Sequence, residues 1–342
     1  MPGVSIRDVA ERARVSVGTV SNVLNRADKV SAAVVERVHA AIAELGYVRN
    51  DAARQLRAGR STTIGLVVLD VRNPFFTDVA RGAEDAAAAN GLSILLGNSD
   101  EDSAREATYL DLFEEQRVHG VLISPFGDVG ARLARLRSRG TPAVLVDRIS
   151  GDGALSSVSV DDVAGGRLAA EHLLESGRRR VAFVGGPFEI RQVSDRHLGA
   201  KNAVDAVAGA TLEVLETGAL TVLEGRRIGE ALVARADSDR PDAVFAANDL
   251  VAMGLLQALV MNGSLLVPGD ILLIGFDDID FAAAAVVPLS SIRQPSQLIG
   301  ETAVGILMEE AADPELEPRQ VVFQPELIVR ESTGNNPATQ PN

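Results

Sequence analysis

The 342-residue sequence contains no cysteine and no tryptophan, and its aromatic residues are ten phenylalanines and two tyrosines. Without cysteine, disulfide bonds, thiolate metal sites and cysteine nucleophiles are excluded. The longest apolar runs, such as residues 64–69, are far shorter than the roughly 20 residues that a membrane-spanning helix needs. The N-terminal residues lack the apolar segment of a secretory signal. We therefore expect a soluble, cytoplasmic protein that makes no membrane contact.

Enzyme signatures are missing as well. The sequence has no G-x-x-x-x-G-K phosphate-binding loop, and Gly151-Asp152-Gly153 lacks the third glycine of a dinucleotide-binding turn. The four histidines show neither metal-ligand spacing nor serine and aspartate partners in the order of a known catalytic triad. We therefore predict that the protein is not an enzyme, has no catalytic residues and needs no cofactor or metal ion.

The charge of the chain is divided unevenly. Residues 1–60 contain ten Lys or Arg and six Asp or Glu, a net charge of +4, whereas the remaining residues carry a net charge of −18. A basic segment attracts nucleic acid and an acidic one repels it. Random drift of surface charge is the alternative interpretation. The division favours a DNA-binding head on an acidic body.

The basic segment has the pattern of three short helices. Apolar residues recur at helical spacing over residues 6–13, 17–24 and 34–45, and Ser5 and Ser16 stand where serine caps a helix. Two short helices around a tight turn, braced by a third, are typical of a helix-turn-helix. The exposed side of the second helix carries small and hydrogen-bonding side chains without Asp or Glu, which suits a DNA major groove. A three-helix packing module with a polar face is the alternative.

Four stretches of the sequence resemble the head of the lactose/galactose repressor family of bacterial transcriptional regulators. They are residues 6–13, residues 15–25, residues 43–50 and residues 53–57. The resemblance extends over nearly the whole chain. It implies a helix-turn-helix DNA-binding head at residues 1–49, which acts as a homodimer on double-stranded DNA.

The resemblance also implies roles for individual residues of the head. Val17, Gly18 and Asn22 are expected to face base edges. The residues expected to hold the DNA backbone are Thr19, Ser21, Asn25 and Tyr47. Asn22 stands where arginine is common in the family, and an asparagine amide pairs with adenine more readily than with guanine. Our hypothesis is therefore an adenine contact at Asn22.

Residues 50–60 are expected to form a hinge helix or linker. An isolated helix of this length is marginal in water, so such a segment can order only when two copies meet on DNA. The resemblance implies that Leu56 wedges between base pairs in the minor groove, with Arg54 beside it. A plain linker with one incidental leucine is the alternative.

The rest of the chain alternates apolar strand-like runs with helix-length segments. Such alternation predicts parallel sheets covered by helices, and two series of runs predict two doubly wound α/β lobes. The resemblance implies a periplasmic-binding-protein-like effector-binding and dimerisation domain at 61–334, with returns of the chain between lobes. The first lobe is expected at about 61–160 and 291–322, and the second at about 161–290 and 323–334. The polar tail at 335–342 is expected to be disordered.

Polar side chains follow several of the predicted strands, where ligands of open α/β sheets bind. Phe126 and other phenylalanines fall in or beside the same loops. The resemblance implies effector contacts at Phe75, Phe76, Asp147, Arg196, Asn248 and Asp277. Helix capping is the alternative role for any single Asp or Asn at these points, Asp249 included.

Two positions depart from the family pattern. Leu220 stands where many sugar-binding members have an aromatic residue, and His119 stands where a small polar residue is usual. We interpret His119 as a surface turn residue. Leu220 predicts weaker stacking on a sugar ring.

Together these features predict a dimeric transcriptional repressor that binds a palindromic operator. Its effector is expected to be a sugar or sugar derivative in the cleft between the lobes. A purine- or nucleoside-responsive member and an effector-independent member of the family are alternatives. A solute-binding protein or a carbohydrate-modifying α/β enzyme are alternatives from other classes.

Overall fold

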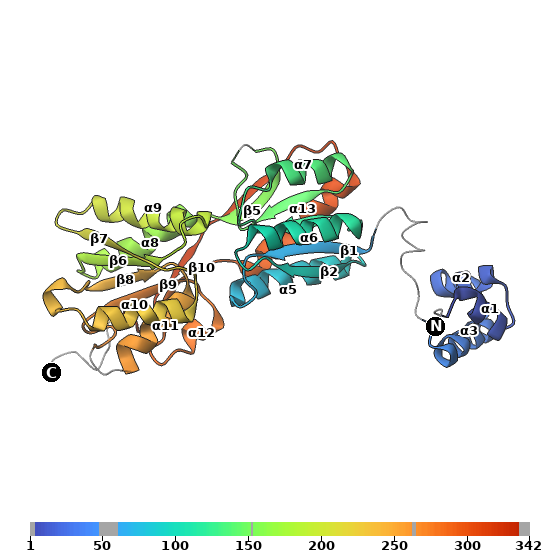
Figure 1. The fold of residues 1–342 in the computed structure, drawn as a ribbon, viewed down its shortest axis with the longest axis horizontal. Helices are drawn as coiled ribbons and strands as arrows, with labels where there is room; N and C mark the ends of the chain where they lie inside the picture. Colours follow the sequence, from blue (N-terminus) through green and yellow to red (C-terminus); the bar gives the residue numbers. More distant parts are fainter. Residues whose placement is uncertain (1–3, 48–60, 152, 262–264, 335–342) are drawn as a thin grey trace. The chain divides into compact units, whose positions relative to one another are not determined.

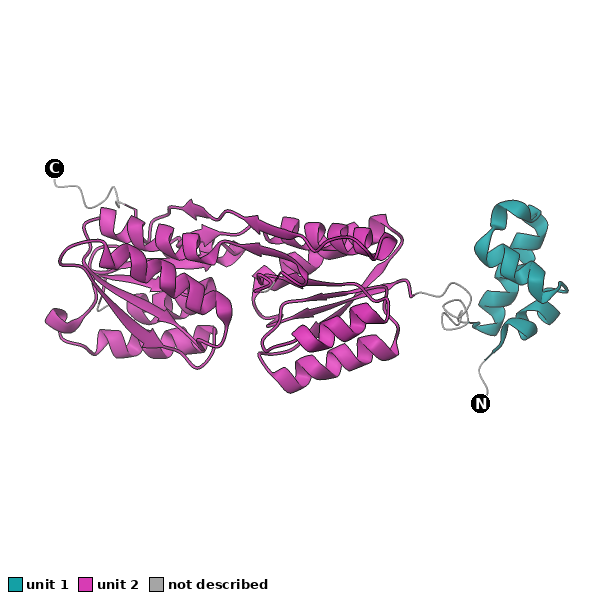
Figure 2. Ribbon diagram, turned by 90° about the horizontal axis from the view of Figure 1, so that it is seen from above, with its two compact units in different colours: residues 1–60 teal, residues 61–342 magenta. Residues whose placement is uncertain are grey.

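The computed structural model describes residues 4–47, 61–151, 153–261 and 265–334. The chain divides into two units, residues 1–60 and residues 61–342 (Figure 2). The expectations for the hinge residues Arg54 and Leu56 and for the tail at 335–342 concern residues outside those described. Among the described residues, no helix combines the length and the apolar character needed to cross a lipid bilayer.

The described part of the first unit contains three α-helices around a small apolar core. They are α1 (Ile6–Arg12), α2 (Val17–Asn25) and α3 (Ala32–Leu45), with a short 3-10 turn η1 (Ala27–Lys29) between the last two. The Oγ of Ser16 caps α2 by accepting a hydrogen bond from the backbone N–H of Thr19 at 3.0 Å. Ser31 precedes α3, but its side chain makes no capping hydrogen bond. The predicted three-helix head is thus confirmed.

The first lobe of the second unit is a parallel sheet in the order β11-β5-β4-β3-β1-β2 (Figure 1). Its strands are β1 (Thr63–Val68), β2 (Ser93–Asn98), β3 (Val121–Ile123), β4 (Ala143–Val146), β5 (Ser156–Val160) and β11 (Gln320–Phe323). Its helices are α5 (Pro74–Ala89), α6 (Ser103–Glu115), α7 (Gly130–Ser138) and α13 (Ser296–Ala312). Strands β1, β3 and β4 are almost wholly buried, which explains their uninterrupted apolar sequence.

The second lobe repeats this architecture in the order β12-β10-β9-β8-β6-β7. Its strands are β6 (Arg180–Gly185), β7 (Thr211–Glu216), β8 (Ala243–Ala246), β9 (Leu272–Asp277), β10 (Ser290–Arg293) and β12 (Glu326–Ile328). Its helices are α8 (Asp162–Glu175), α9 (Arg191–Asp205), α10 (Val222–Val233), α11 (Asp249–Met261) and α12 (Asp280–Ala283), with a 3-10 turn η2 (Asp237–Asp239). Only the edge pairing of β12 with β10 is antiparallel among the strand pairs described.

The chain passes between the lobes three times. The passages follow β5, β10 and β11. The second passage was expected near residue 291, but β10 stays in the second lobe through Arg293. The reason is local bonding, because the N–H of Ser290 donates to the Oγ of Ser332 at 2.8 Å and the Oγ of Ser291 donates to Asp249 at 2.7 Å.

Paired helices on each lobe cross at glycine. A Cβ atom placed on Gly166 of α8 would lie 2.0 Å from the carbonyl oxygen of Arg196 on α9. A Cβ atom on Gly199 of α9 would lie 2.0 Å from the carbonyl oxygen of Val163. The same reciprocal contact joins α10 to α11 and α5 to α13. Helix α9 is therefore held backbone to backbone against α8, and this fixes where Arg196 enters the cleft.

Candidate functional site

Helix α2 presents a face of small and polar groups to solvent. Val20 and Val23 are buried in the core of the head, whereas Val17, Gly18 and Asn22 are exposed. The structure therefore places all three residues predicted to read bases on the outer side of one helix. No acidic residue stands within α2, so nothing on the helix itself repels phosphate.

Gly18 has no structural role in the packing of the described head. A Cβ atom built on it would meet only the Oγ of Ser16, at 3.6 Å. An alanine would also favour the helix, because glycine costs about 0.5–1 kcal/mol relative to alanine in a helix interior. The missing side chain thus leaves room for an outside partner to approach the backbone closely.

Three of the four residues predicted to hold the DNA backbone, Thr19, Ser21 and Asn25, are on the same helix. The hydroxyls of Thr19 and Ser16 are 2.9 Å apart, and the side-chain amide of Asn25 donates to the backbone oxygen of Ser21 at 2.7 Å. Tyr47, beyond α3, is half-buried against the core of the head. These contacts orient the polar groups before any DNA is bound.

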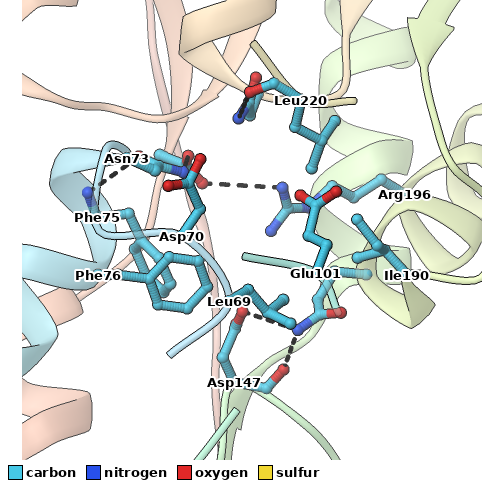
Figure 3. Close-up of a pocket in the computed structure, with 13 residues that line it drawn as sticks. Leu69, Asp70, Asn73, Phe75, Phe76, Glu101, Asp147, Ile190, Arg196 and Leu220 are labelled. Carbon is cyan, nitrogen blue, oxygen red and sulfur yellow. Dashed lines mark hydrogen bonds and ion pairs between the residues drawn. The ribbon is translucent and has the colours of Figure 1, made fainter. Parts of the chain in front are cut away.

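The second candidate site is a pocket between the two lobes (Figure 3). Both sheets direct the carboxyl ends of their parallel strands toward it, as expected for ligand sites in open α/β sheets. The first lobe contributes Leu69, Asp70, Asn73, Phe75, Phe76, Glu101 and Asp147. The second lobe contributes Ile190, Gln192, Arg196, Leu220, Asn248 and Asp277.

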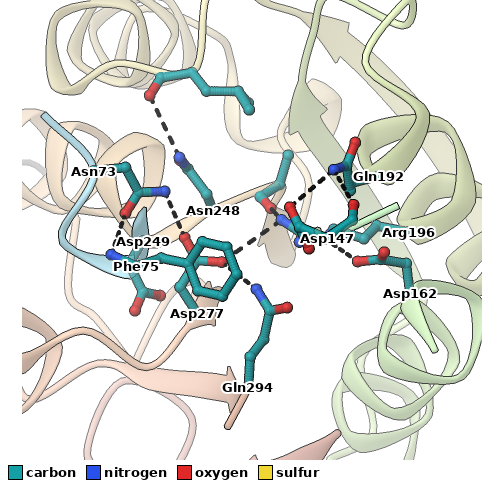
Figure 4. Close-up of polar contacts among 12 residues, drawn as sticks. Asn73, Phe75, Asp147, Asp162, Gln192, Arg196, Asn248, Asp249, Asp277 and Gln294 are labelled. Atoms are coloured by element: carbon teal, nitrogen blue, oxygen red, sulfur yellow. Dashed lines mark hydrogen bonds and ion pairs between the residues drawn. The ribbon is translucent and has the colours of Figure 1, made fainter. Parts of the chain in front are cut away.

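Arg196 is the buried cation of this pocket, and only 4% of it is exposed. Its Nε donates to Oδ1 of Asp162 at 2.7 Å, and its Nη1 donates to the carbonyl oxygen of Ala247 at 2.9 Å (Figure 4). Its Cζ lies 3.7 Å from the centroid of the Phe276 ring. Oδ1 of Asp277 is 3.8 Å from Nη1. The planar guanidinium is thus stacked, oriented and paired before a ligand arrives.

Asp277 links the two lobes at the end of β9. Its Oδ2 accepts from the side-chain amide of Asn73 in the first lobe at 2.9 Å, and its Oδ1 accepts from Gln294 at 2.7 Å. Its φ of 109° is unusual for a residue other than glycine. Burial raises the pKa of Asp277, and Arg196 and the two amide donors oppose that rise.

Asp147 makes the other polar link between the lobes. The side-chain amide of Gln192, on α9, donates to Oδ2 of Asp147 at 2.8 Å. The second carboxylate oxygen of Asp147 and the side-chain oxygen of Gln192 are buried with no hydrogen-bond partner among the described residues. Burial raises the pKa of Asp147 well above its ordinary value, and the charge of Asp162 adds to the rise. Because buried acceptors are rarely left without a donor, these two oxygens favour a ligand that donates N–H or O–H groups.

Asn248 both lines the pocket and caps α11, because its side-chain oxygen accepts from the N–H of Val251 at 2.9 Å. Asp249, which we considered as a cap, is instead fully buried, and it accepts from the Ser291 hydroxyl and from the N–H of Ile279. The capping alternative therefore applies to Asn248, and Asp249 is an internal tether between α11, β10 and the start of α12.

The phenylalanines separate into two groups. Phe75 and Phe76 line the pocket with their ring centroids 5.0 Å apart in an edge-to-face arrangement. Phe126 is half-buried against the same apolar core, but it does not line the pocket. The carboxylate of Glu106 accepts from the backbone N–H of Phe126 at 2.7 Å and so holds the loop after β3.

Sequence reasoning did not select several lining residues. Three of them are polar, namely Asp70, Glu101 and Gln192. Asp70 has a signal in the sequence, since only Leu69 separates it from the end of β1. Glu101 and Gln192 have no such signal in the sequence, because Glu101 enters the pocket from a loop and Gln192 from the start of α9. Glu101 has a positive φ of 56°, and burial, followed by the charge of Asp70, raises its pKa to about 7.

Metal binding finds no support in the described part of the chain, where no group of three or more His, Asp or Glu side chains could hold an ion. His119 lies in the turn before β3 and donates its backbone N–H to Thr63.

Comparison with known proteins finds a family match in each of the two units. The sequence profile of the lacI family of bacterial regulatory proteins matches residues 5–50, and that of the periplasmic binding protein-like domain matches residues 170–333. The transcriptional repressor PurR of Aliivibrio fischeri is 33% identical over 334 residues, covering 97% of this chain and 98% of that protein. The ribose operon repressor of Escherichia coli K12 is 32% identical, covering 96% and 99%.

Solved structures show the same architecture. A lac repressor dimer bound to operator and an anti-inducer superposes with a TM-score of 0.81 at 27% identity, covering 97% of this chain and 99% of that one. A regulator from Enterococcus faecium with bound ribose gives a TM-score of 0.72 at 30% identity, covering 79% and 98%. The chain therefore belongs to the lacI family of bacterial regulatory proteins, and it is a DNA-binding transcriptional regulator rather than an enzyme.

Proposed function

We propose that the protein is a repressor that binds a palindromic operator as a homodimer and releases it when a sugar or sugar derivative enters the cleft. The single observation that carries the effector role is the pocket itself. Its walls come from both lobes, and Arg196 and Asp277 are buried there with their side chains already oriented. A molecule bound by both walls favours one arrangement of the lobes over another.

The chemistry of the pocket favours a polyhydroxylated ligand. Carboxylate and amide oxygens of Asp147, Gln192 and Asp277 are acceptors for ligand O–H groups, and the guanidinium of Arg196 is a donor. Phe75 and Phe76 supply an apolar wall. Leu220 lines the opposite side, so a ligand ring is not held between two aromatic faces. A purine is the second candidate, because the aromatic wall suits it and several relatives are PurR repressors.

Coupling between ligand and DNA follows from the interlobe contacts. Asn73 reaches Asp277 and Gln192 reaches Asp147 across the cleft, so a ligand that replaces or reinforces these bonds moves one lobe against the other. A 100-fold difference in ligand affinity between two arrangements supplies about 2.7 kcal/mol. In this proposal the movement changes the spacing of two hinge segments and the ability of Leu56 to enter the minor groove.

The dimer is assigned to an apolar face of the second lobe, formed by α10, α11 and α12. Its exposed side chains include Leu223, which is 76% exposed, and Phe281, which is 59% exposed. A groove on this face is lined by Val222, Leu250, Met253, Leu256, Gln257, Val260, Met261, Phe281, Ala284, Ala285 and Val286. A contiguous apolar surface of this kind is unusual on a monomer.

Light scattering tests the dimer face. Phe281→Asp is expected to convert the dimer to a monomer, because a carboxylate cannot be buried unpaired at an interface. Leu198→Asp, on α9, is the control, since Leu198 is an exposed apolar residue outside this face. A dimer that survives Phe281→Asp would remove the assignment.

Two titrations test the function as a whole. A duplex selected from a random pool is expected to bind in the cytoplasmic salt range at least about 1,000 times more tightly than unselected duplex. A screen of sugars and nucleobases by thermal unfolding is expected to find a ligand that stabilises the body, by about 2.7 kcal/mol at 100 times its Kd. An effector-independent regulator would pass the first titration and fail the second.

We propose that the protein is cytoplasmic and that it lies at the nucleoid when it is bound to its operator.

A further inference from the structure

The pocket between the lobes contains more acid than base. Its lining includes four carboxylates, Asp70, Glu101, Asp147 and Asp277, and one cation, Arg196. A cation in such a partly closed site is weakly screened, and it favours the ionised form of a nearby carboxyl group whose pKa burial has raised. The excess of acceptors over donors points to the class of molecule that fits.

The one cation in this lining already has carboxylate partners within the protein. Arg196 is paired with Asp162 at 2.7 Å and lies 3.8 Å from Asp277. Asp70 is likewise paired, since the Nε of Arg72 donates to both of its carboxylate oxygens at 2.9 and 3.0 Å. These two pairs leave Glu101 and Asp147 as the carboxylates without an arginine partner within 4 Å in the described chain.

Glu101 stands in the pocket without a side-chain partner among the described residues. Its backbone N–H donates to Leu69, and a positive φ of 56° turns the residue at this point. Figure 3 shows its side chain among the labelled residues that converge on the pocket. Its neighbour Asp100 instead faces away to Arg72 and Arg105. The loop therefore holds one acid in the pocket and neutralises the next one outside it.

A second observation points to a donor-rich ligand. Asp147 is 3% exposed and Gln192 is 4% exposed, and each has one buried oxygen with no hydrogen-bond partner among the described residues. Both residues line the pocket. A buried oxygen without a donor is costly, so a ligand that brings N–H or O–H groups to these two oxygens is favoured.

We propose that the natural effector is an amino sugar or a related polyol that carries an ammonium group, and that Glu101 receives this ammonium group. The inference rests on the proposed function of the pocket as the effector site. The ligand hydroxyls fill the acceptors on Asp147, Gln192 and Asp277, and the apolar face of the ring packs on Phe75 and Phe76. A neutral sugar offers Glu101 a hydroxyl donor but no opposite charge. A sugar phosphate or sugar acid brings a like charge to a site that is already acidic.

Calorimetry with matched probes tests this inference on the full-length protein at pH 7.0. The pairs are glucosamine and glucose, galactosamine and galactose, and mannosamine and mannose, with glucose 6-phosphate as the anionic probe. At least one amine is expected to bind ten-fold or more tightly than its neutral partner, and the phosphate is expected not to bind. Equal or tighter binding of the neutral sugars, or no binding by any of the three amines, overturns the inference.

A variant separates Glu101 from general effects. Glu101→Gln keeps the shape of the side chain, and it is expected to reduce the ten-fold preference for the amine over its neutral partner to about one. Asp100→Asn is the control, because it removes a neighbouring acid that does not line the pocket. An unchanged preference in Glu101→Gln contradicts the assignment. Operator release by a neutral sugar sinks this inference alone, whereas absence of any operator preference sinks the proposed function.

Discussion

At the scale of single residues, a substitution at Gly18 tests the stability of the head and its operator affinity separately. Gly18→Ala is expected to leave the head as stable as before, or more stable by up to about 1 kcal/mol, because a Cβ atom there meets only Ser16 at 3.6 Å. Operator affinity is expected to fall at least ten-fold, because Gly18 is predicted to face base edges and the methyl group would occupy that space. Thermal unfolding and fluorescence anisotropy with the selected duplex measure the two effects. Unchanged operator affinity would mean that this face of α2 does not meet the DNA closely.

Arg196 has a proposed role in ligand binding, and it also forms a buried ion pair within the second lobe. Removing Arg196 alone leaves Asp162 buried without its counter-ion. Breaking a buried ion pair in this way lowers the free energy of unfolding by about 3–5 kcal/mol. Arg196→Met combined with Asp162→Asn is expected to recover part of that loss while the response to effector stays absent. Denaturant unfolding of the two single variants and the double variant forms the test. Strictly additive losses would show that the pair is not coupled.

Glu101 also makes stability depend on pH. Its pKa of about 7 in the folded protein lies above the ordinary value of 4.5, so between these values the folded state binds more protons than the unfolded state. Stability from this group therefore falls as pH rises from about 4.5 to 7. Glu101→Gln is expected to unfold at a higher temperature relative to wild type at pH 8 than at pH 5. A difference that stays constant across this range would contradict the raised pKa.

At the scale of helices and strands, sequence patterns predicted most of the body. Strands β3, β4 and β8 are the clearest cases, because a buried parallel strand is apolar throughout and therefore stands out as an apolar run. The lining of the pocket was less predictable. Gln192 and Glu101 reach it only because helix packing and a turn with positive φ direct them there, and neither feature has a local pattern. Phe126 shows the converse, since its position in a strand-end loop did not bring it to the pocket.

The glycine crossings are the element-scale feature most open to test. Gly199→Ala is expected to lower the unfolding free energy by about 1–3 kcal/mol or more, because the new Cβ atom lies 2.0 Å from a backbone oxygen that cannot rotate away. Gly305→Ala is the matched control in α13, where a Cβ atom meets nothing within 4 Å. This control is expected to stabilise the protein by up to about 1 kcal/mol. Equal effects of the two substitutions would refute a backbone contact between α8 and α9.

At the scale of the whole molecule, the two units differ in net charge and in the kind of site that each contains. A basic head carries a reading helix free of acid, and an acidic body carries a pocket whose walls come from both lobes. The acidic body is repelled by DNA, so only the head and the hinge are suited to contact it. Regulation then requires that the arrangement of the two lobes changes how two heads are presented.

The most direct test of this account is a titration of the full-length protein with a fluorescent operator duplex and with random duplex, each with and without the ligand found by the thermal screen. The account predicts at least about a 1,000-fold preference for the operator at moderate salt. It also predicts at least a ten-fold loss of operator affinity when the ligand is saturating, with little change for random duplex. Equal affinity for both duplexes, unaffected by any ligand that binds the body, would contradict it.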